Sequence, residues 1–381
     1  MSSDILRFLD SSNIDGFLFV GDSISNSDMY YLSHFLAGDR FAILFQEKTS
    51  ILVSSMEKGR AKKEACADEV LSTRDYHIME KLKSCGKPEL AYIEALKDFL
   101  RDHGVLRLGV AYSFPIGIFQ PLSRHFDIQI LESPARRARS KKSPQEIDCI
   151  TTAQRACERA MQRAVELIAC SEPRGDTLYL QGQPLTAEQI RSAIDISLLV
   201  DGCEAEDTIV AGGTQAAEPH ARGTGPLPAN SPIVIDIYPR SKTNRYYADM
   251  TRTVLRGEAP GEVKELYHAV LAAQEAGIGA IRSGISGEEV HAAVSAVFQE
   301  MGYSERDGCG FTHSTGHGVG LDVHELPSLS EGGEILKSSQ VVTVEPGLYY
   351  PDIGGVRLED LLVVRDKGCE NLTRCRKDLV L

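Results

Sequence analysis

The chain has 381 residues, and its 41 basic and 54 acidic side chains give a formal charge of −13 with neutral histidines. This length exceeds what one hydrophobic core usually spans, so two domains are expected. The 42% hydrophobic content excludes a disordered chain, and the acidic balance argues against non-specific nucleic-acid binding. No apolar run reaches the roughly 20 residues that cross a bilayer, and the N-terminus lacks the features of a signal peptide. We therefore expect a cytoplasmic protein.

Cysteine usage agrees with that compartment. The cysteines are Cys66, Cys85, Cys149, Cys157, Cys170, Cys203, Cys309, Cys369 and Cys375. Their number is odd and no two form a C-x-x-C pair, which argues against a disulfide framework or a structural zinc site. We expect them to be mostly buried, small hydrophobic residues.

The first third of the chain alternates strand and helix signals. An apolar helical pattern begins at Pro88 and stops at Gly104, which is a favourable residue after a helix end. Short apolar runs predict strands at Gly16–Val20, Phe41–Phe45, Ile51–Val53, Val105–Ala111 and Phe126–Leu131. This pattern indicates an α/β domain, and nothing in it suggests catalysis.

A change in composition follows at Pro134–Lys142, which is basic and lacks apolar periodicity. We interpret this segment as a solvated linker rather than a binding patch, because the chain as a whole is acidic. Ser143, Pro144 and Glu146 then provide an N-cap, a proline in the first turn and a capping-box glutamate for a new helix. The domain boundary is therefore predicted near residue 142, separating residues 1–142 from residues 143–381.

The second part shows the order helix, helix, strand pair twice. Helices near 144–170 and 187–200 precede a strand pair around 233–255, and helices near 262–282 and 287–301 precede one around 341–364. Capping boxes recur at Thr186 with Gln189 and at Ser286 with Glu289. The two halves do not visibly repeat in sequence, so the order of elements alone suggests a duplicated α+β architecture.

Aspartates interrupt the first of these strand pairs. Asp236 lies in an apolar run, and Asp249 lies in the next one. A hairpin that closes on Ser241–Asn244 would place the two side chains directly opposite each other. Facing carboxylates repel, and burial increases the cost, so the pair needs a cation or a shared proton.

The second strand pair repeats this anomaly. Glu345 ends one apolar run and Glu359 lies in the next, symmetric about Asp352 in the connecting segment 351–354. A second pair of carboxylates is therefore expected to face across a hairpin. One such pair could be a coincidence, but two favour metal binding over a purely structural role.

Three of the ten histidines fall within the run H-S-T-G-H-G-V-G-L-D-V-H-E, at His313, His317 and His324. Glycines around His317 allow close backbone approach. The run is neither an H-E-x-x-H helix nor a dinucleotide-binding fingerprint, and the chain contains no G-x-S-x-G elbow.

Four carboxylates and one imidazole are more charge than a single divalent ion requires. They suit two ions that share bridging carboxylates, and oxygen-rich ligation favours Mn, Co, Fe or Zn. Two ions that share a water molecule lower its pKa and generate hydroxide near neutral pH. Hydrolysis is the expected reaction class.

These motifs resemble those of the methionine aminopeptidase/prolidase clan of "pita-bread" metallopeptidases. The resemblance covers essentially the whole chain, with residues 1–142 similar to the creatinase/prolidase N-terminal domain and residues 143–381 similar to the catalytic domain. It rests on Y-Y-A-D-M-T-R-T, H-S-T-G-H-G-V-G-L-D-V-H-E, V-E-P-G-L-Y and G-G-V-R-L-E-D.

The resemblance implies a site that holds two divalent ions. Its metal ligands would be Asp236, Asp249, His317, Glu345 and Glu359. Among them Asp249 and Glu359 would bridge the ions, Asp236 would complete one ion, and His317 with Glu345 would complete the other.

The resemblance also assigns roles around the metals. His220 would contact the scissile region of the substrate, and His324 would stabilise the tetrahedral intermediate. Glu345 would shuttle the proton to the leaving amine. His313 and Arg357 would bind the substrate or support the ligands.

The N-terminal domain implies the proline-specific branch, with hydrolysis of Xaa-Pro bonds in dipeptides or at peptide N-termini and with homodimers common among relatives. Two alternatives stay open: a non-catalytic relative that binds peptides or proteins, and a creatinase-like C–N hydrolase. Two features depart from the family pattern. The connection after Asp236 reads Ile-Tyr-Pro and is longer than usual, which puts substrate preference in doubt, and residues 174–186 resemble an insertion of unassigned role.

Overall fold

The computed structural model describes residues 2–303 and 308–381, and it divides into two compact units, one ending at Arg139 and one beginning at Ser140. Each unit has its own hydrophobic core. Within the described residues, no helix combines the length and the apolar character needed to span a bilayer.

The N-terminal unit is built on a six-stranded mixed sheet with the strand order β4-β3-β2-β1-β5-β6. Its elements are α1 (Ser2–Ser11), β1 (Gly16–Gly21), α2 (Ser27–Ser33), β2 (Phe41–Phe45), β3 (Thr49–Val53), α3 (Lys58–Glu64), β4 (Glu69–Ser72), α4 (Ile78–Cys85), α5 (Pro88–Asp102), β5 (Arg107–Ala111), α6 (Ile116–Leu122), β6 (Asp127–Leu131) and α7 (Pro134–Ser140). Every strand predicted for this region is present, because continuous apolar runs form buried strands such as β2.

The solvated linker predicted at 134–142 is wrong. Residues Pro134–Ser140 form helix α7, and two basic side chains of the segment are buried. Arg139 Nε lies 2.9 Å from Asp28 Oδ1, and Lys142 Nζ lies 2.6 Å from Glu325 Oε2 with both side chains 1% exposed. Composition alone indicated solvent exposure, but acidic partners far away in the sequence neutralise these charges.

The C-terminal unit begins with α8 (Pro144–Ala169), and all of the named strand pairs in its sheets are antiparallel. Its other helices are α9 (Ala187–Val200), the 3-10 helix η1 (Gly213–Ala217), α10 (Gly261–Ala280) and α11 (Gly287–Glu300). Its strands are β7 (Glu172–Arg174), β8 (Thr177–Leu180), β9 (Gln183–Pro184), β10 (Cys203–Glu204), β11 (Ile209–Gly212), β12 (Ile233–Ile237), β13 (Arg240–Ser241), β14 (Met250–Val254), β15 (Gly316–Gly318), β16 (Glu325–Leu329), β17 (Val341–Val344), β18 (Gly347–Tyr350), β19 (Gly354–Arg357), β20 (Asp360–Arg365) and β21 (Gly368–Asn371).

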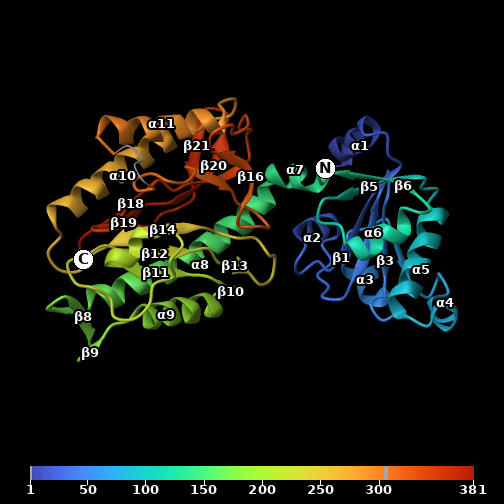
Figure 1. Cartoon of the computed structure of the whole chain (residues 1–381), viewed down its shortest axis with the longest axis horizontal. Coiled ribbons are helices and arrows are strands. Elements are labelled where there is room, and N and C mark those ends of the chain that lie inside the picture. The colour runs from blue at the N-terminus through green and yellow to red at the C-terminus, as the bar shows by residue number, and fades with distance from the viewer. Residues whose placement is uncertain (1, 304–307) are drawn as a thin grey trace. The chain divides into compact units, whose positions relative to one another are not determined.

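The predicted repetition of elements is present in this unit. Helices α8 and α9 precede the pair β12–β14, and α10 and α11 precede the pair β17–β20. The predicted capping boxes close the N-termini of α8, α9 and α11. Figure 1 shows the two helix pairs on opposite sides of the strands, so the helices cover a sheet layer that carries the acidic residues.

The first hairpin pairs differently from the prediction. Asp236 lies opposite Thr251, not opposite Asp249, because the turn closes further along the chain, where Ser241 N donates to Tyr246 O. This changes the partner of Asp236 by two positions. Since side chains alternate faces along a strand, a shift of two leaves both aspartates on the same face.

The second hairpin has the predicted register. Val344 pairs with Asp360, and Gly347 pairs with Arg357, so Glu345 and Glu359 lie opposite each other between these pairs. The ladder is interrupted at this point, where the strands divide into β17–β20 and β18–β19. Glu359 N instead donates to Thr251 O at 3.1 Å, which joins the second hairpin to β14 of the first.

Two other sequence features can now be placed. Residues 174–186 contribute to a small sheet of β7, β8 and β9, with Gly175 and Gly182 at positive φ in its turns. All nine cysteines are free thiols, but the prediction that most are buried is wrong. Only Cys157 and Cys203 are buried, because the remaining seven lie near the ends of elements or in partly exposed segments.

The ion pair between Lys142 and Glu325 yields a stability prediction. The substitution Lys142→Met leaves a buried carboxylate without its cation, which costs about 3–5 kcal/mol of unfolding free energy. Urea denaturation of the full chain measures this loss. Lys141→Met is the matched control, since Lys141 is exposed and its loss should change little. Equal stability of the two variants would contradict the prediction.

Candidate metal centre

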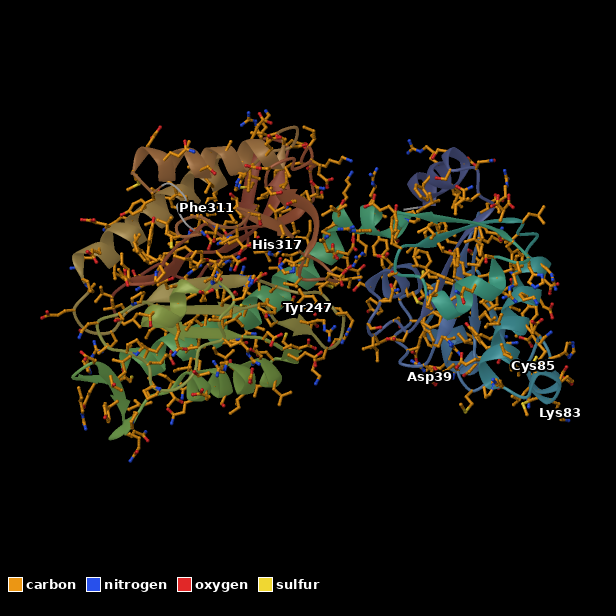
Figure 2. The ribbon with its side chains drawn as sticks, viewed as in Figure 1. Asp39, Lys83, Cys85, Tyr247, Phe311 and His317 are labelled. Atoms are coloured by element: carbon orange, nitrogen blue, oxygen red, sulfur yellow. The ribbon has the colours of Figure 1, made fainter. Side chains whose placement is uncertain are left out.

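The predicted ligands come together in the C-terminal unit. Asp236 lies on β12, and Asp249 directly precedes β14. Oxygen and nitrogen atoms of Asp249, His317 and Glu359 lie within 4.8 Å of one another. Asp236 and Glu345 line the same cavity of about 810 Å³, together with those three residues. Figure 2 shows His317 in the interior of this unit, between the two helix pairs.

In two of these carboxylates, the protein provides a hydrogen bond to only one of the two oxygens. Asp236 Oδ2 accepts a 2.7 Å hydrogen bond from Arg357 Nη2, and Glu359 Oε2 accepts one of 2.9 Å from Thr251 Oγ1. The other oxygens, Asp236 Oδ1 and Glu359 Oε1, are buried and have no partner among the described residues. A buried anionic oxygen without a partner is costly, so both atoms are suited to ligate a cation.

His317 and Glu345 form the other side of the centre. His317 Nε2 lies 3.1 Å from Glu345 Oε1 and 3.8 Å from Asp249 Oδ2. Thr343, two residues before Glu345 on the same strand face, accepts from His317 N and donates to Glu345 Oε1. Thr343 thus fixes the backbone of His317 and one oxygen of Glu345 beside the centre.

Without a cation, this arrangement shifts the pKa values strongly. Burial and the neighbouring Asp236 carboxylate raise the pKa of Asp249 well above its usual range, and burial with the charge of Asp249 does the same for Glu359. Burial also raises the pKa of Asp236, although Arg357 opposes the shift. The cluster therefore cannot hold its full negative charge unless positive charge is supplied.

The pKa values of His317 and Glu345 shift in the directions that favour the charged forms. Burial opposes ionisation of both groups, but their mutual hydrogen bond and charge attraction outweigh it. The pKa of His317 rises to about 9, and that of Glu345 falls to about 2. A proton thus stands on His317 where the resemblance places a metal, and a divalent cation would displace it.

The predicted accessory residues surround the same cavity. His220 and His324 both line it, and the His324 ring centroid lies 4.3 Å from that of His317. His313 and Arg357 also line it and share one partner, the Tyr349 hydroxyl, at 2.9 and 2.8 Å. Desolvation lowers the pKa of both His313 and His324, which favours neutral rings.

Sequence reasoning missed several residues that hold the centre. Tyr349, Thr251 and Thr343 bind predicted site residues through their hydroxyl groups. The strand pattern in the sequence could have identified Thr251 and Thr343, because they stand two positions from Asp249 and Glu345, on the same strand faces. The sequence pattern could not identify Tyr349, since its role depends on the pairing of β18 with β19.

The donor set fits divalent cations. The predicted ligands contribute four carboxylates and one imidazole to the cavity, and among the described residues two of their buried oxygens lack partners and no thiol lines the cavity. Oxygen and imidazole ligands suit Mn, Co, Fe or Zn. The geometry supports at least one ion among Asp249, His317 and Glu359.

The fold and the site together place the protein in the class of metal-dependent hydrolases with two domains. Residues 148–366 match the model of metallopeptidase family M24, and residues 3–140 match the creatinase/prolidase N-terminal domain. The chain belongs to metallopeptidase family M24. The resemblance stated from the sequence motifs is thereby confirmed.

The chain matches similar proteins over nearly its full length. The chain is 29% identical to a Xaa-Pro dipeptidase of Pyrococcus horikoshii, over 99% of this chain and 97% of that protein. A Xaa-Pro dipeptidase structure from Bacillus anthracis has a TM-score of 0.83 at 25% identity, covering 100% of this chain and 99% of that one. An X-Pro aminopeptidase structure from Thermotoga maritima has a TM-score of 0.80 at 28% identity, with 100% and 99% covered.

The raised pKa of His317 predicts how pH affects the metal-free protein. Folding raises this pKa from 6.5 to about 9. The protonated ring therefore contributes fully to the free energy of unfolding below pH 6.5, and this contribution is lost as the pH rises through 9. The raised pKa values of Asp249 and Glu359 act in the same direction. With a chelator present, unfolding free energy should fall by roughly 2–3 kcal/mol between pH 6.5 and 9.

Urea denaturation at the two pH values measures this change. The control is His317→Asn, whose decrease should be clearly smaller than that of the unsubstituted protein. Added Mn²⁺ should restore stability at pH 9, since the cation replaces the bound protons. Identical pH dependence in the two proteins would refute the assignment.

Proposed function

We propose that the protein is a metal-dependent peptidase that hydrolyses Xaa-Pro bonds. The observation that carries this proposal is the single cavity that holds Asp236, Asp249, His317, Glu345 and Glu359 in a member of family M24. The names of the similar proteins support the proline preference, since both dipeptidases and an aminopeptidase acting on X-Pro occur among them.

The five ligands would hold two divalent ions, with Asp249 and Glu359 as bridges. Such ions supply a nucleophile at neutral pH and polarise the scissile carbonyl. The Glu345 carboxylate lines the cavity, with Oε1 accepting a hydrogen bond from Thr343 Oγ1, and it would accept a proton from the attacking water. The same group would deliver that proton to the leaving proline nitrogen, which must be protonated before it departs.

The surrounding residues would orient the reactants. His220 and His324 line the cavity, where they would donate hydrogen bonds to the substrate carbonyl and the developing oxyanion. Arg357 and His313, held by the Tyr349 hydroxyl, would position Asp236 and the wall of the cavity. A homodimer and a cytoplasmic location remain predictions that follow from the resemblance and the sequence.

Hydrolysis assays test the proposal. Purified protein loaded with Mn²⁺ or Co²⁺ should cleave Xaa-Pro dipeptides, Xaa-Pro peptides with longer C-terminal extensions, or both. Absence of cleavage of either class, with bound metal shown by elemental analysis, would refute it. Activity that survives complete metal removal would instead support a creatinase-like C–N hydrolase.

Asp249→Asn tests the bridging assignment. Loss of one bridging charge should lower kcat/KM by about a thousandfold or more. Folding should change little, because the substitution also removes repulsion from Asp236 in the metal-free protein. Asp366→Asn, in an exposed turn, is the control and should retain activity. Near-normal turnover of Asp249→Asn would show that Asp249 does not bridge.

A further inference from the structure

The segment 320–324 connects β15, which carries His317, to β16 and ends at His324. It forms neither helix nor strand, and the pairing of β15 with β16 shifts register between His317 and Gly318. Both histidine rings nevertheless meet in the cavity, with their centroids 4.3 Å apart. The path of this segment therefore determines where His324 stands relative to the predicted ligand His317.

The imidazole of His324 is not fixed by hydrogen bonds of its own. Among the described residues, no side chain or backbone group forms a hydrogen bond or ion pair with this ring, and the ring of His317 is its aromatic neighbour. His324 is also exposed, whereas His317 is half-buried. Since a catalytic side chain needs surrounding support to keep a productive geometry, the backbone of the segment must provide that support.

The carboxylate of Glu325 anchors this backbone. Its Oε1 accepts hydrogen bonds from Leu321 N at 2.8 Å and from Asp322 N at 3.1 Å. Gly320 packs so closely that a Cβ atom there would lie 2.4 Å from Glu325 Oε2. Gly320 O also accepts from Tyr247 N at 2.8 Å, which adds a contact outside the segment. The segment thus wraps around one buried carboxylate.

Lys142 neutralises this carboxylate. Its Nζ lies 2.6 Å from Glu325 Oε2, and both side chains are 1% exposed. The backbone of Lys142 is itself fixed, because its N donates to Ser339 O at 2.9 Å. A buried ion pair often adds little net stability over apolar side chains of the same size, since desolvation offsets the attraction. The pair instead fixes a direction, because its charge-assisted hydrogen bond holds Oε2 and leaves Oε1 to the two backbone N–H groups.

We propose that Lys142 and Glu325 are positioning residues for catalysis, and that their ion pair holds the segment 320–324 so that the His324 imidazole reaches the developing oxyanion. The inference rests on the proposed function and adds the residues on which His324 depends. Neither Lys142 nor Glu325 lines the cavity, so an effect of either on turnover must pass through the segment. A displacement of about 1 Å at a catalytic group can lower a rate on the order of a hundredfold.

Steady-state kinetics of the Mn²⁺-loaded enzyme on Ala-Pro and Ala-Pro-Ala test this. Lys142→Met should lower kcat by about ten- to hundredfold, with KM and metal content nearly unchanged, because the ligands stay in place. Lys142→Arg should retain part of the activity, since it keeps the cation. The decisive comparison adds Lys142→Met to His324→Ala. If the ion pair acts through His324, the added substitution has no further effect on kcat.

NMR signals of the imidazole rings in the metal-free protein give a readout that does not depend on turnover. Lys142→Met should shift the ring signals of His324, which the spectrum of His324→Ala identifies, and should leave those of His268 unchanged. His268 is exposed on α10. Lys141→Met is the matched control for both experiments, because Lys141 is adjacent but exposed, and it should change neither kcat nor the spectrum.

Should Lys142→Met fail to fold, Gly320→Ala takes its place, because the added Cβ displaces the same carboxylate while both charges remain. The inference is overturned if the folded, metal-loaded variant keeps a normal kcat, or if kcat falls by the same factor with and without His324. Full activity of His324→Ala would also overturn it. Cleavage of neither substrate by the unsubstituted, metal-loaded protein would instead contradict the proposed function on which the inference rests.

Discussion

The structure of the C-terminal unit depends on one electrostatic constraint, the desolvation of four carboxylates within a single cavity. Asp249 and Glu359 are almost fully buried, and their pKa values are raised because burial and mutual repulsion disfavour the charged forms. Arg357 and His317 supply positive charge to the cluster, but they neutralise it only in part. Divalent cations would complete this balance, so the same repulsion that costs stability in the metal-free protein provides affinity for metal.

The antiparallel strands provide the rigidity that this constraint requires. Asp249, Glu345 and Glu359 each stand directly beside the end of a strand, where the backbone is held but the side chain can turn toward the cavity. Thr251 and Thr343 fix one oxygen of a neighbouring carboxylate by a hydrogen bond. Arg357 fixes one oxygen of Asp236 in the same way, so the unpartnered oxygens of Asp236 and Glu359 remain inside the cavity rather than relaxing toward solvent.

The hairpin that carries Asp236 and Asp249 has an inner part with the predicted ligands and an outer part around β13. The residues near the centre match the family motifs, whereas the outer segment with Tyr238 and Arg240 departs from the usual pattern after Asp236. Glu204, from β10, anchors this outer segment through its pairing with β13. The pairing of β12 with β14 holds Asp236 opposite Thr251 on the inner side of this outer segment, so a change in the tip can leave that carboxylate in place.

The sequence by itself determined the two-part organisation, most of the predicted helices and strands, and the identity of the residues that line the centre. These follow from local signals: apolar periodicity, capping boxes at residues such as Ser143, and carboxylates where strands should be apolar. The burial of Lys142, the two-residue shift in the pairing of Asp236, and the partners of Arg357 and Tyr349 were decided only by the tertiary structure. Each of these depends on which other segment supplies the opposing charge or hydrogen bond. A local pattern in one segment contains no information about that partner, which for Lys142 and for the contact of Arg357 with Asp236 lies more than 100 residues away.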